Sequence, residues 1–253
     1  MHISCQTLWL PKHGSSAEEY EDAYSPKDKI NQDKKVFRCA VADGATETSF
    51  SNIWAQLLAD AYVEEDLNIE QLAKIWKQKT TKADQTWYVE EKLAGGAFAA
   101  LVGLTIRASK DKREKSGTWQ AQAAGDSCLF QVRNKELITC YPMKKWTQFN
   151  SNPELLSSNT KNNTDEVTET LSTTIEEEWR SGDVFYLMTD AIACWFLRRH
   201  DDTEDATDAI ATITSQDTLF NLANTERRHK DDDGRAWMRN DDVTLMRIFV
   251  TVE

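Results

Sequence analysis

The sequence is poor in the residues that most often bind zinc or form redox centres. It has four histidines, which are scattered along the chain, and five cysteines, none of which forms a Cys-x-x-Cys pair. A multi-histidine zinc site, a zinc knuckle and a dithiol redox site are therefore not expected. We expect the cysteines to be small buried apolar residues, which suits a reducing compartment.

Long apolar runs and an excess of positive charge are also absent. The longest apolar stretch, 94–104, is too short to cross a bilayer, and no secretory leader pattern opens the sequence, so we expect a cytoplasmic protein. Lys and Arg number 30 against 42 Asp and Glu, which gives a formal net charge of -12. Because such a chain is repelled by polyanions, neither nucleic acid nor membrane is expected as a partner.

The length and apolar content of the chain are sufficient for one large packed domain. The sequence has 253 residues, of which 40% are hydrophobic, and it includes nine tryptophans. It shows no internal repeat and no linker long enough to divide it. We therefore expect a single domain spanning 1–253.

Apolar residues recur with strand-like and helix-like periods along the chain. Runs of strands with helical pairs between them indicate an α+β sandwich rather than strict alternation of strands and helices. The segment 147–170 is poor in large apolar side chains and is predicted to be a long surface excursion. Strands are predicted at 3–10, 36–42, 97–108, 182–188 and 242–252, with two more on either side of Gly125-Asp126 within 118–134, and helices at 51–67, 69–92, 191–197, 203–213 and 216–228.

Four aspartates stand at a predicted strand end or tight turn. Taken singly, each is explained as a helix cap or a turn residue, for which Asp is favoured. Taken together, carboxylates at the ends of buried strands can converge on one rim, where their repulsion demands raised pKa values or a bound cation. An all-oxygen cluster without His or Cys suits Mg²⁺ or Mn²⁺. The four residues are Asp43, Asp126, Asp190 and Asp241.

Six short motifs occur in an order that resembles the type 2C, metal-dependent serine/threonine protein phosphatases, in their bacterial-like form. Any one of these motifs is weak evidence, but six in the family's order are fairly specific. They extend over residues 21–250 and read YEDAY, AVADGAT, AGGAFAAL, AAGDSCLFQV, YLMTDAI and RNDDVTLMRI.

The resemblance implies a four-layer αββα sandwich, in which two antiparallel sheets are flanked by helix pairs and a binuclear metal centre lies at one edge. It implies that Asp43 bridges both ions and that Asp190 and Asp241 hold one of them. A water activated by the two Mg²⁺ or Mn²⁺ ions would then attack the phosphorus of a phosphoserine or phosphothreonine.

The same resemblance assigns further ligands around the two ions. The Gly44 carbonyl would complete one coordination shell, and Glu21 and Asp22 would act through metal-bound waters. Asp126, together with Asp190, would form a weaker third metal site.

The chain also departs from the family pattern. Bacterial relatives commonly place a phosphate-clamping arginine four residues before the acidic pair, where this chain has Ala17. Lys12 and His13 are the nearest candidates for phosphate binding, although a lysine cannot reproduce the fork of a guanidinium. The family usually has further glycines after its first Asp-Gly motif, where this chain has other residues at 45–47. It also usually has a glycine after its later Thr-Asp, where this chain has Ala191.

These departures keep other hypotheses open. The chain could be a catalytically impaired phosphatase-like module that binds a phosphoprotein or a kinase. It could also be an acidic interaction domain with ordinary turn aspartates, which would not bind divalent ions tightly. For the phosphatase we expect a phosphoprotein substrate, a cognate Ser/Thr kinase as a candidate partner, and a monomer.

Overall fold

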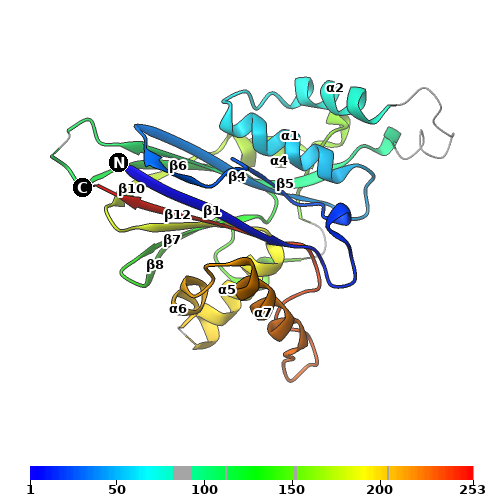
Figure 1. Cartoon of the computed structure of the whole chain (residues 1–253). Coiled ribbons are helices and arrows are strands. Elements are labelled where there is room, and N and C mark those ends of the chain that lie inside the picture. Colours follow the sequence, from blue (N-terminus) through cyan, green and yellow to red (C-terminus); the bar gives the residue numbers. More distant parts are fainter. Residues whose placement is uncertain (82–92, 112, 151–152, 204, 253) are drawn as a thin grey trace.

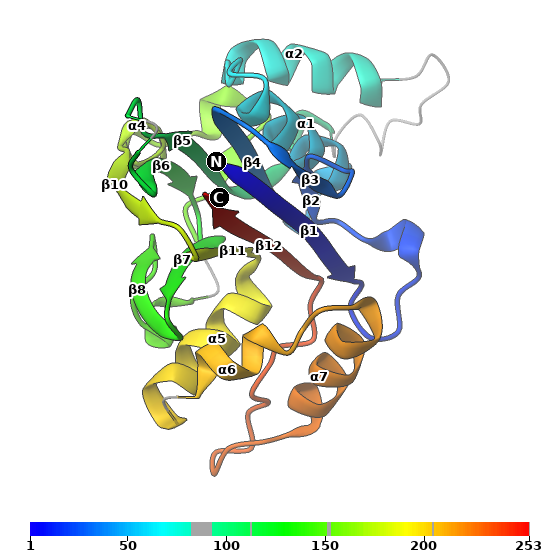
Figure 2. The same cartoon turned by 60° about the vertical axis from the view of Figure 1, so that its left-hand side comes forward.

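Two antiparallel β-sheets lie face to face between two layers of helices (Figures 1 and 2). The structure is a computed structural model, and it describes residues 1–81, 93–111, 113–150, 153–203 and 205–252. Helices α1, α2 and α4 cover one sheet, and α5, α6 and α7 cover the other (Figure 1). The arrangement confirms the predicted α+β, four-layer αββα sandwich.

The sheet around β12 has the strand order β3-β1-β12-β11-β7-β8. Its first and last strands in the sequence, β1 and β12, are paired neighbours, and this brings the two ends of the chain together (Figure 2). Its strands are β1 (His2–Leu10), β3 (Ile30–Asp33), β7 (Cys128–Arg133), β8 (Glu136–Tyr141), β11 (Val184–Met188) and β12 (Val243–Thr251).

The sheet around β5 has the order β10-β6-β5-β4-β2, and the short β9 also pairs with β5. Its strands are β2 (Ala23–Ser25), β4 (Val36–Gly44), β5 (Phe98–Ala108), β6 (Ser116–Ala124), β9 (Leu156–Ser157) and β10 (Ile175–Arg180). The helices are α1 (Ser51–Val63), α2 (Ile69–Thr80), α4 (Asp165–Ser172), α5 (Asp190–Thr203), α6 (Ala206–Ala211) and α7 (Gln216–Arg228), with 3-10 turns η1 (Ala17–Glu19), η2 (Trp146–Gln148) and η3 (Thr160–Asn162).

The core has three apolar layers, because the central strands are buried on both faces. In β12, Met246, Ile248 and Val250 point between the sheets, whereas Val243 and Leu245 pack under the helices. Successive side chains of a strand point to opposite faces, so a strand buried on both faces is apolar throughout. This is why the central strands appear in the sequence as continuous apolar runs.

Most predicted elements are confirmed, and the differences are local. The predicted helix 51–67 ends at Val63, because Glu65 takes a left-handed conformation with φ of 60° and turns the chain. The predicted helix 69–92 ends at Thr80, and its part from 82 to 92 lies outside the described residues. Helix α4 was not predicted within 147–170. It begins at the cap formed by Thr164, whose Oγ1 accepts a hydrogen bond from the Val167 N–H.

The tight turn predicted at Gly125-Asp126 joins two different sheets. Strand β6 belongs to the β5 sheet and β7 to the β12 sheet, so the two predicted strands do not form a hairpin. Gly125 has φ of +82°, and a Cβ there would lie 2.7 Å from the Ala100 Cβ, so the crossing requires glycine. The turn places Asp126 between the two sheets.

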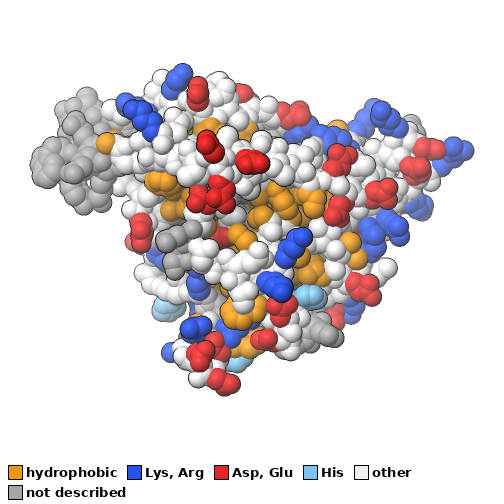
Figure 3. Space-filling view, turned by 180° about the vertical axis from the view of Figure 1, so that it is seen from behind, with side chains coloured by type: hydrophobic (Ala, Val, Ile, Leu, Met, Phe, Trp, Pro, Cys, Tyr) orange, Lys and Arg blue, Asp and Glu red, His pale blue; other side chains and the backbone are white. Residues whose placement is uncertain are grey.

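The described helices and one face of the surface have the following properties. None of the described helices is long and apolar enough to span a membrane. On the face opposite to that of Figure 1, the described acidic and basic side chains are intermixed and form no continuous basic surface (Figure 3).

We predict that Gly103→Ala destabilises the protein. Gly103 lies in β5 under α1, and a Cβ there would stand 2.4 Å from ring carbons of the buried Tyr62. Overpacking of this kind costs roughly 1–3 kcal/mol, which urea unfolding would measure. Gly95→Ala is the control, because a Cβ at Gly95 meets nothing within 4 Å. Equal stability of the two variants would contradict the close packing of α1 on β5.

Candidate active site

Four strand-end aspartates surround one cavity of about 520 Å³ at an edge of the sandwich. Asp43 is the second-to-last residue of strand β4, Asp126 is in the crossing between β6 and β7, and Asp190 is the first residue of α5 after β11. Strands β11 and β12 are antiparallel, with Met188 opposite Leu245, so the end of one lies beside the start of the other. This pairing brings Asp241, which precedes β12, to the same edge as Asp190.

Two further segments of the chain line the cavity beside the aspartates. The loop after β4, from Gly44 to Thr48, forms one wall with Phe98 of β5. Asn150, Pro153 and Leu155, from the segment predicted as a surface excursion, also line it. That segment therefore borders the aspartates rather than lying elsewhere on the surface.

Asp190 is the aspartate with the most defined contacts. It is buried, and its Oδ2 accepts a hydrogen bond of 2.6 Å from Nη2 of Arg239. Its Oδ1 is buried and has no hydrogen-bond partner. A carboxylate oxygen without a partner in the interior is costly, so this atom is available for a cation.

Burial and mutual repulsion raise the pKa values of Asp43, Asp126 and Asp190. Burial is the main cause of the raised pKa of Asp43, and the charges of Asp22, Asp190, Asp126 and Asp241 add to it. Burial, followed by the charge of Asp190, raises the pKa of Asp126 to about 7, although the guanidinium of Arg239 opposes the rise. Clustered carboxylates of this kind are stabilised by cations.

Glu21 and Asp22 lie behind the cavity, with their oxygens engaged by the protein. Asp22 is buried, and its Oδ2 accepts hydrogen bonds from the hydroxyls of Thr189 (2.9 Å) and Thr244 (2.6 Å). Glu21 accepts a hydrogen bond of 2.8 Å from the Ser51 hydroxyl. Neither is among the described residues that line the cavity, although Asp22 is near enough to raise the pKa of Asp43.

Gly44 lies where a side chain would not fit. A Cβ there would stand 2.6 Å from the Glu21 carbonyl oxygen and 3.0 Å from the Ser51 carbonyl carbon. The glycine therefore allows the end of β4 to approach the acidic pair.

Lys12 and His13 are not among the described residues that line the cavity. Lys12 Nζ lies 3.6 Å from Glu21 Oε2, and the backbone N–H of His13 donates to the Asn240 side chain. Among the described residues that line the cavity, the one cationic side chain is Arg239. The sequence analysis did not select this residue, although its position two residues before Asp241 was a usable signal.

The cysteines are unsuited to nucleophilic catalysis. All five are free thiols, and burial raises the pKa of Cys194 to about 11 and that of Cys5 to about 12. Thiols with such pKa values are not ionised near neutral pH. Cys5, Cys39 and Cys128 are buried, as predicted, whereas Cys140 and Cys194 are only half-buried because they lie at the edge of the core.

The residues around the cavity fit a divalent ion in part. Within the described part of the chain, no three His, Cys, Asp or Glu side chains are already arranged as a metal site. The partnerless Oδ1 of Asp190, in the same cavity as the raised-pKa carboxylates of Asp43 and Asp126, is nevertheless an oxygen of the kind that Mg²⁺ and Mn²⁺ prefer. Its other oxygen is paired with Arg239.

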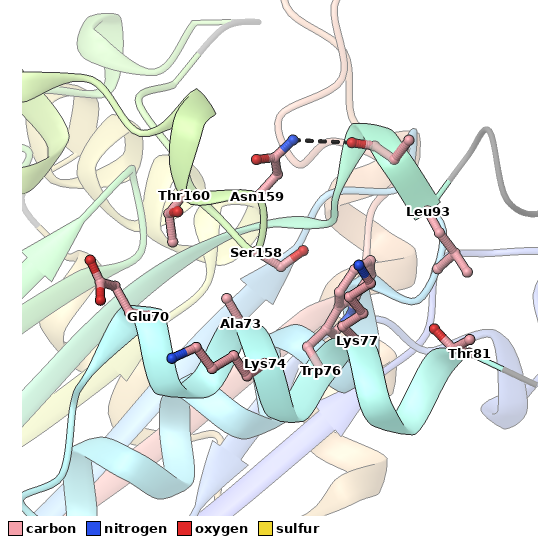
Figure 4. Close-up of a pocket in the computed structure, with 11 residues that line it drawn as sticks. Glu70, Ala73, Lys74, Trp76, Lys77, Thr81, Leu93, Ser158, Asn159 and Thr160 are labelled. Atoms are coloured by element: carbon pink, nitrogen blue, oxygen red, sulfur yellow. Dashed lines mark hydrogen bonds between the residues drawn. The ribbon is translucent and has the colours of Figure 1, made fainter.

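A larger groove, of about 640 Å³, lies elsewhere, between α2 and the residues around η3. Figure 4 shows Lys74 and Lys77 on its α2 side, facing Ser158 and Asn159, and the Asn159 amide donates to the Ala94 carbonyl. Glu70 is the one carboxylate among its described lining residues. The groove therefore lacks the acid cluster and is not the candidate active site.

Comparisons with solved structures show the fold of protein phosphatases. The chain matches the Mycobacterium tuberculosis serine/threonine phosphatase PstP/Ppp with a TM-score of 0.59 and 14% identity, over 99% of this chain and 100% of that one. It matches the photosystem II phosphatase PBCP with a TM-score of 0.53 and 16% identity, over 99% and 100%. It matches the structure of the PP2C phosphatase domain and part of the regulatory domain of Bacillus subtilis SpoIIE with a TM-score of 0.52 and 14% identity, over 99% and 64%.

Comparisons at the level of sequence find no matching protein family and no matching curated protein. The chain thus has the fold of the type 2C phosphatases, as the order of its motifs indicated, at a sequence identity that shows the fold alone. The assignment of individual ligands depends on the cavity of this chain.

We predict that Asp126→Asn makes the metal-free protein more stable at alkaline pH. A folded-state pKa near 7, against an ordinary value near 4, gives stability that is present below pH 4 and lost as the pH rises through 7. The variant avoids this loss, so we expect it to be more stable than the parent by up to about 4 kcal/mol at pH 8 and equal to it near pH 4.

Urea unfolding at the two pH values, in the presence of a chelator, measures this difference. Asp28→Asn is the control, because Asp28 is exposed on a loop. A parent protein as stable as the Asp126 variant at pH 8 would contradict the repulsion inferred for the cavity.

Proposed function

We propose that the chain is a divalent-metal-dependent phosphoprotein phosphatase that hydrolyses phosphoserine and phosphothreonine. The observation that carries the proposal is the convergence of Asp43, Asp126, Asp190 and Asp241 on one cavity, in a chain with the fold of such phosphatases. The partnerless buried oxygen of Asp190 supports it further, since a folded protein rarely keeps such an atom without a use.

Asp43, Asp190 and Asp241 are the residues proposed to hold the ions. They come from the ends of different strands, and the sandwich brings them to one cavity. The Gly44 carbonyl is proposed as a further ligand. Because Gly44 has no side chain, the end of β4 can pack against the backbone of Glu21. Glu21 and Asp22 are proposed to act from behind the cavity, where their hydrogen bonds hold them in place.

Two Mg²⁺ or Mn²⁺ ions, when bound, supply an acidified water as the nucleophile and neutralise the phosphoryl oxygens. Without cations, four aspartates against the single charge of Arg239 would repel a phosphate dianion. The chain itself needs only to position the reacting groups and to exclude bulk water. No protein nucleophile is required, which agrees with the un-ionised thiols.

We predict that Asp43→Asn and Asp190→Asn each lower Mn²⁺-dependent hydrolysis of a phosphothreonine peptide by at least about 100-fold. Each change removes a charged ligand from the centre of the cavity, where cations hold the reacting groups. Released phosphate measures the activity, and circular dichroism confirms the fold of each variant.

Asp28→Asn is the control and should keep full activity, because it changes the same charge far from the cavity. Failure of the parent protein to release phosphate from several phosphopeptides in saturating Mn²⁺ would overturn the proposal. Unchanged activity of the two variants would overturn the assigned ligands.

A second candidate function is that of a phosphatase-like module that binds a phosphoprotein or kinase without cleaving phosphate. It is favoured by Ala17, which replaces the usual phosphate-clamping arginine, and by the ion pair that occupies one oxygen of Asp190. Calorimetry with a phosphopeptide distinguishes the two, because binding without phosphate release supports the module.

A further inference from the structure

The resemblance to type 2C phosphatases implies a third metal site formed by Asp126 and Asp190. In this chain the side chain of Arg239 contacts one of these two carboxylates. Nη2 of Arg239 is 2.6 Å from Asp190 Oδ2. Arg239, Asp126 and Asp190 line the same cavity, and the charge of the guanidinium opposes the rise in pKa that burial causes at both carboxyls. One cation of the chain is therefore already close to both carboxylates that would hold the third ion.

We infer that Arg239 is the resident cation of the Asp126–Asp190 pair and replaces the third divalent ion, so that removing its charge opens a cation site there. The inference concerns the metal stoichiometry of the proposed phosphatase and rests on that function only for the two remaining ions. It predicts one more bound ion in an Arg239 variant than in the parent.

The shape and permanent charge of the Arg239 guanidinium suit it to take the place of a divalent ion beside Asp190. A guanidinium is always protonated and presents donors in a fixed plane, so it stays paired with a carboxylate at any physiological pH. Asp190 and Asp126 are both buried, and the ion pair from the more exposed Arg239 compensates the charge of Asp190. A divalent ion at this position would have to displace Arg239 from Asp190 Oδ2, while the partnerless Oδ1 remains available to an ion on the other side.

The loop that carries Arg239 is anchored on both sides of it. The preceding Met238 is buried in the core under α5 and α7, and its backbone N–H donates to the Glu226 carbonyl (3.2 Å). After it, the Asn240 side chain pairs with the His13 backbone, and the Asp242 carboxylate accepts from the backbone N–H groups of Lys12 (2.8 Å) and Glu21 (2.6 Å). The fold therefore holds Arg239 at the cavity.

The test is the number of Mn²⁺ ions bound at saturation, measured on the full chain by equilibrium dialysis and elemental analysis. We expect Arg239→Gln to bind one more ion than the parent, and the double variant Arg239→Gln/Asp126→Asn to lose that ion. Arg235→Gln is the matched control, because it removes the same charge from an exposed position of the same loop. It should bind as many ions as the parent.

A second variant keeps the test decisive should Arg239→Gln not fold. Asp126→Asn alone should bind as many ions as the parent, because no divalent ion uses Asp126 while Arg239 is present. Loss of one ion in that variant, or an unchanged count in folded Arg239→Gln, overturns the inference.

The outcomes for the two proposals are separable. A parent that binds two ions but an Arg239 variant that gains none leaves the phosphatase in place and removes the role of Arg239. A parent that binds no ion, with an Arg239 variant that gains one through Asp126, removes the phosphatase and supports the role of Arg239.

Discussion

The mutual repulsion of carboxylates gathered at one edge of the sandwich is the constraint on which the rest of the site depends. Asp43 and Asp126 come from the β5 sheet and its crossing, whereas Asp190 and Asp241 come from the ends of β11 and β12 in the other sheet. Stacking of the sheets brings these charges together, and burial raises the pKa values of Asp43, Asp126 and Asp190. The folded chain therefore holds a site that favours cations, although its sequence is acidic throughout.

The residues behind the cavity show how the fold withstands this repulsion. Asp22 precedes β2 of one sheet and accepts hydrogen bonds from Thr189 and Thr244 of the other. Asp242 accepts hydrogen bonds from backbone N–H groups of the loop between β1 and β2. These hydrogen bonds join the two sheets at the edge where the cavity aspartates lie.

Much of this arrangement could be predicted from the sequence, because the information is local. A buried strand that ends in Asp-Gly, or that leads into a helix through Thr-Asp, places its carboxylate at the strand end whatever the rest of the fold. The roles of Glu21 and Asp22 were less predictable, since their partners Ser51, Thr189 and Thr244 are distant in sequence. Lys12 was selected for its closeness to the acidic pair, but its ammonium group lies beside Glu21 and outside the cavity.

The sequence by itself determined the periods of the strands and helices, the acids at the strand ends and the lack of a reactive thiol, since each depends on residues close together in the chain. Only the tertiary structure decided that β6 and β7 belong to different sheets, that the segment after η2 borders the cavity, and that Arg239 reaches Asp190. The physical reason is that alternation of apolar residues shows which face of a strand is buried, but not which strand or side chain lies against it.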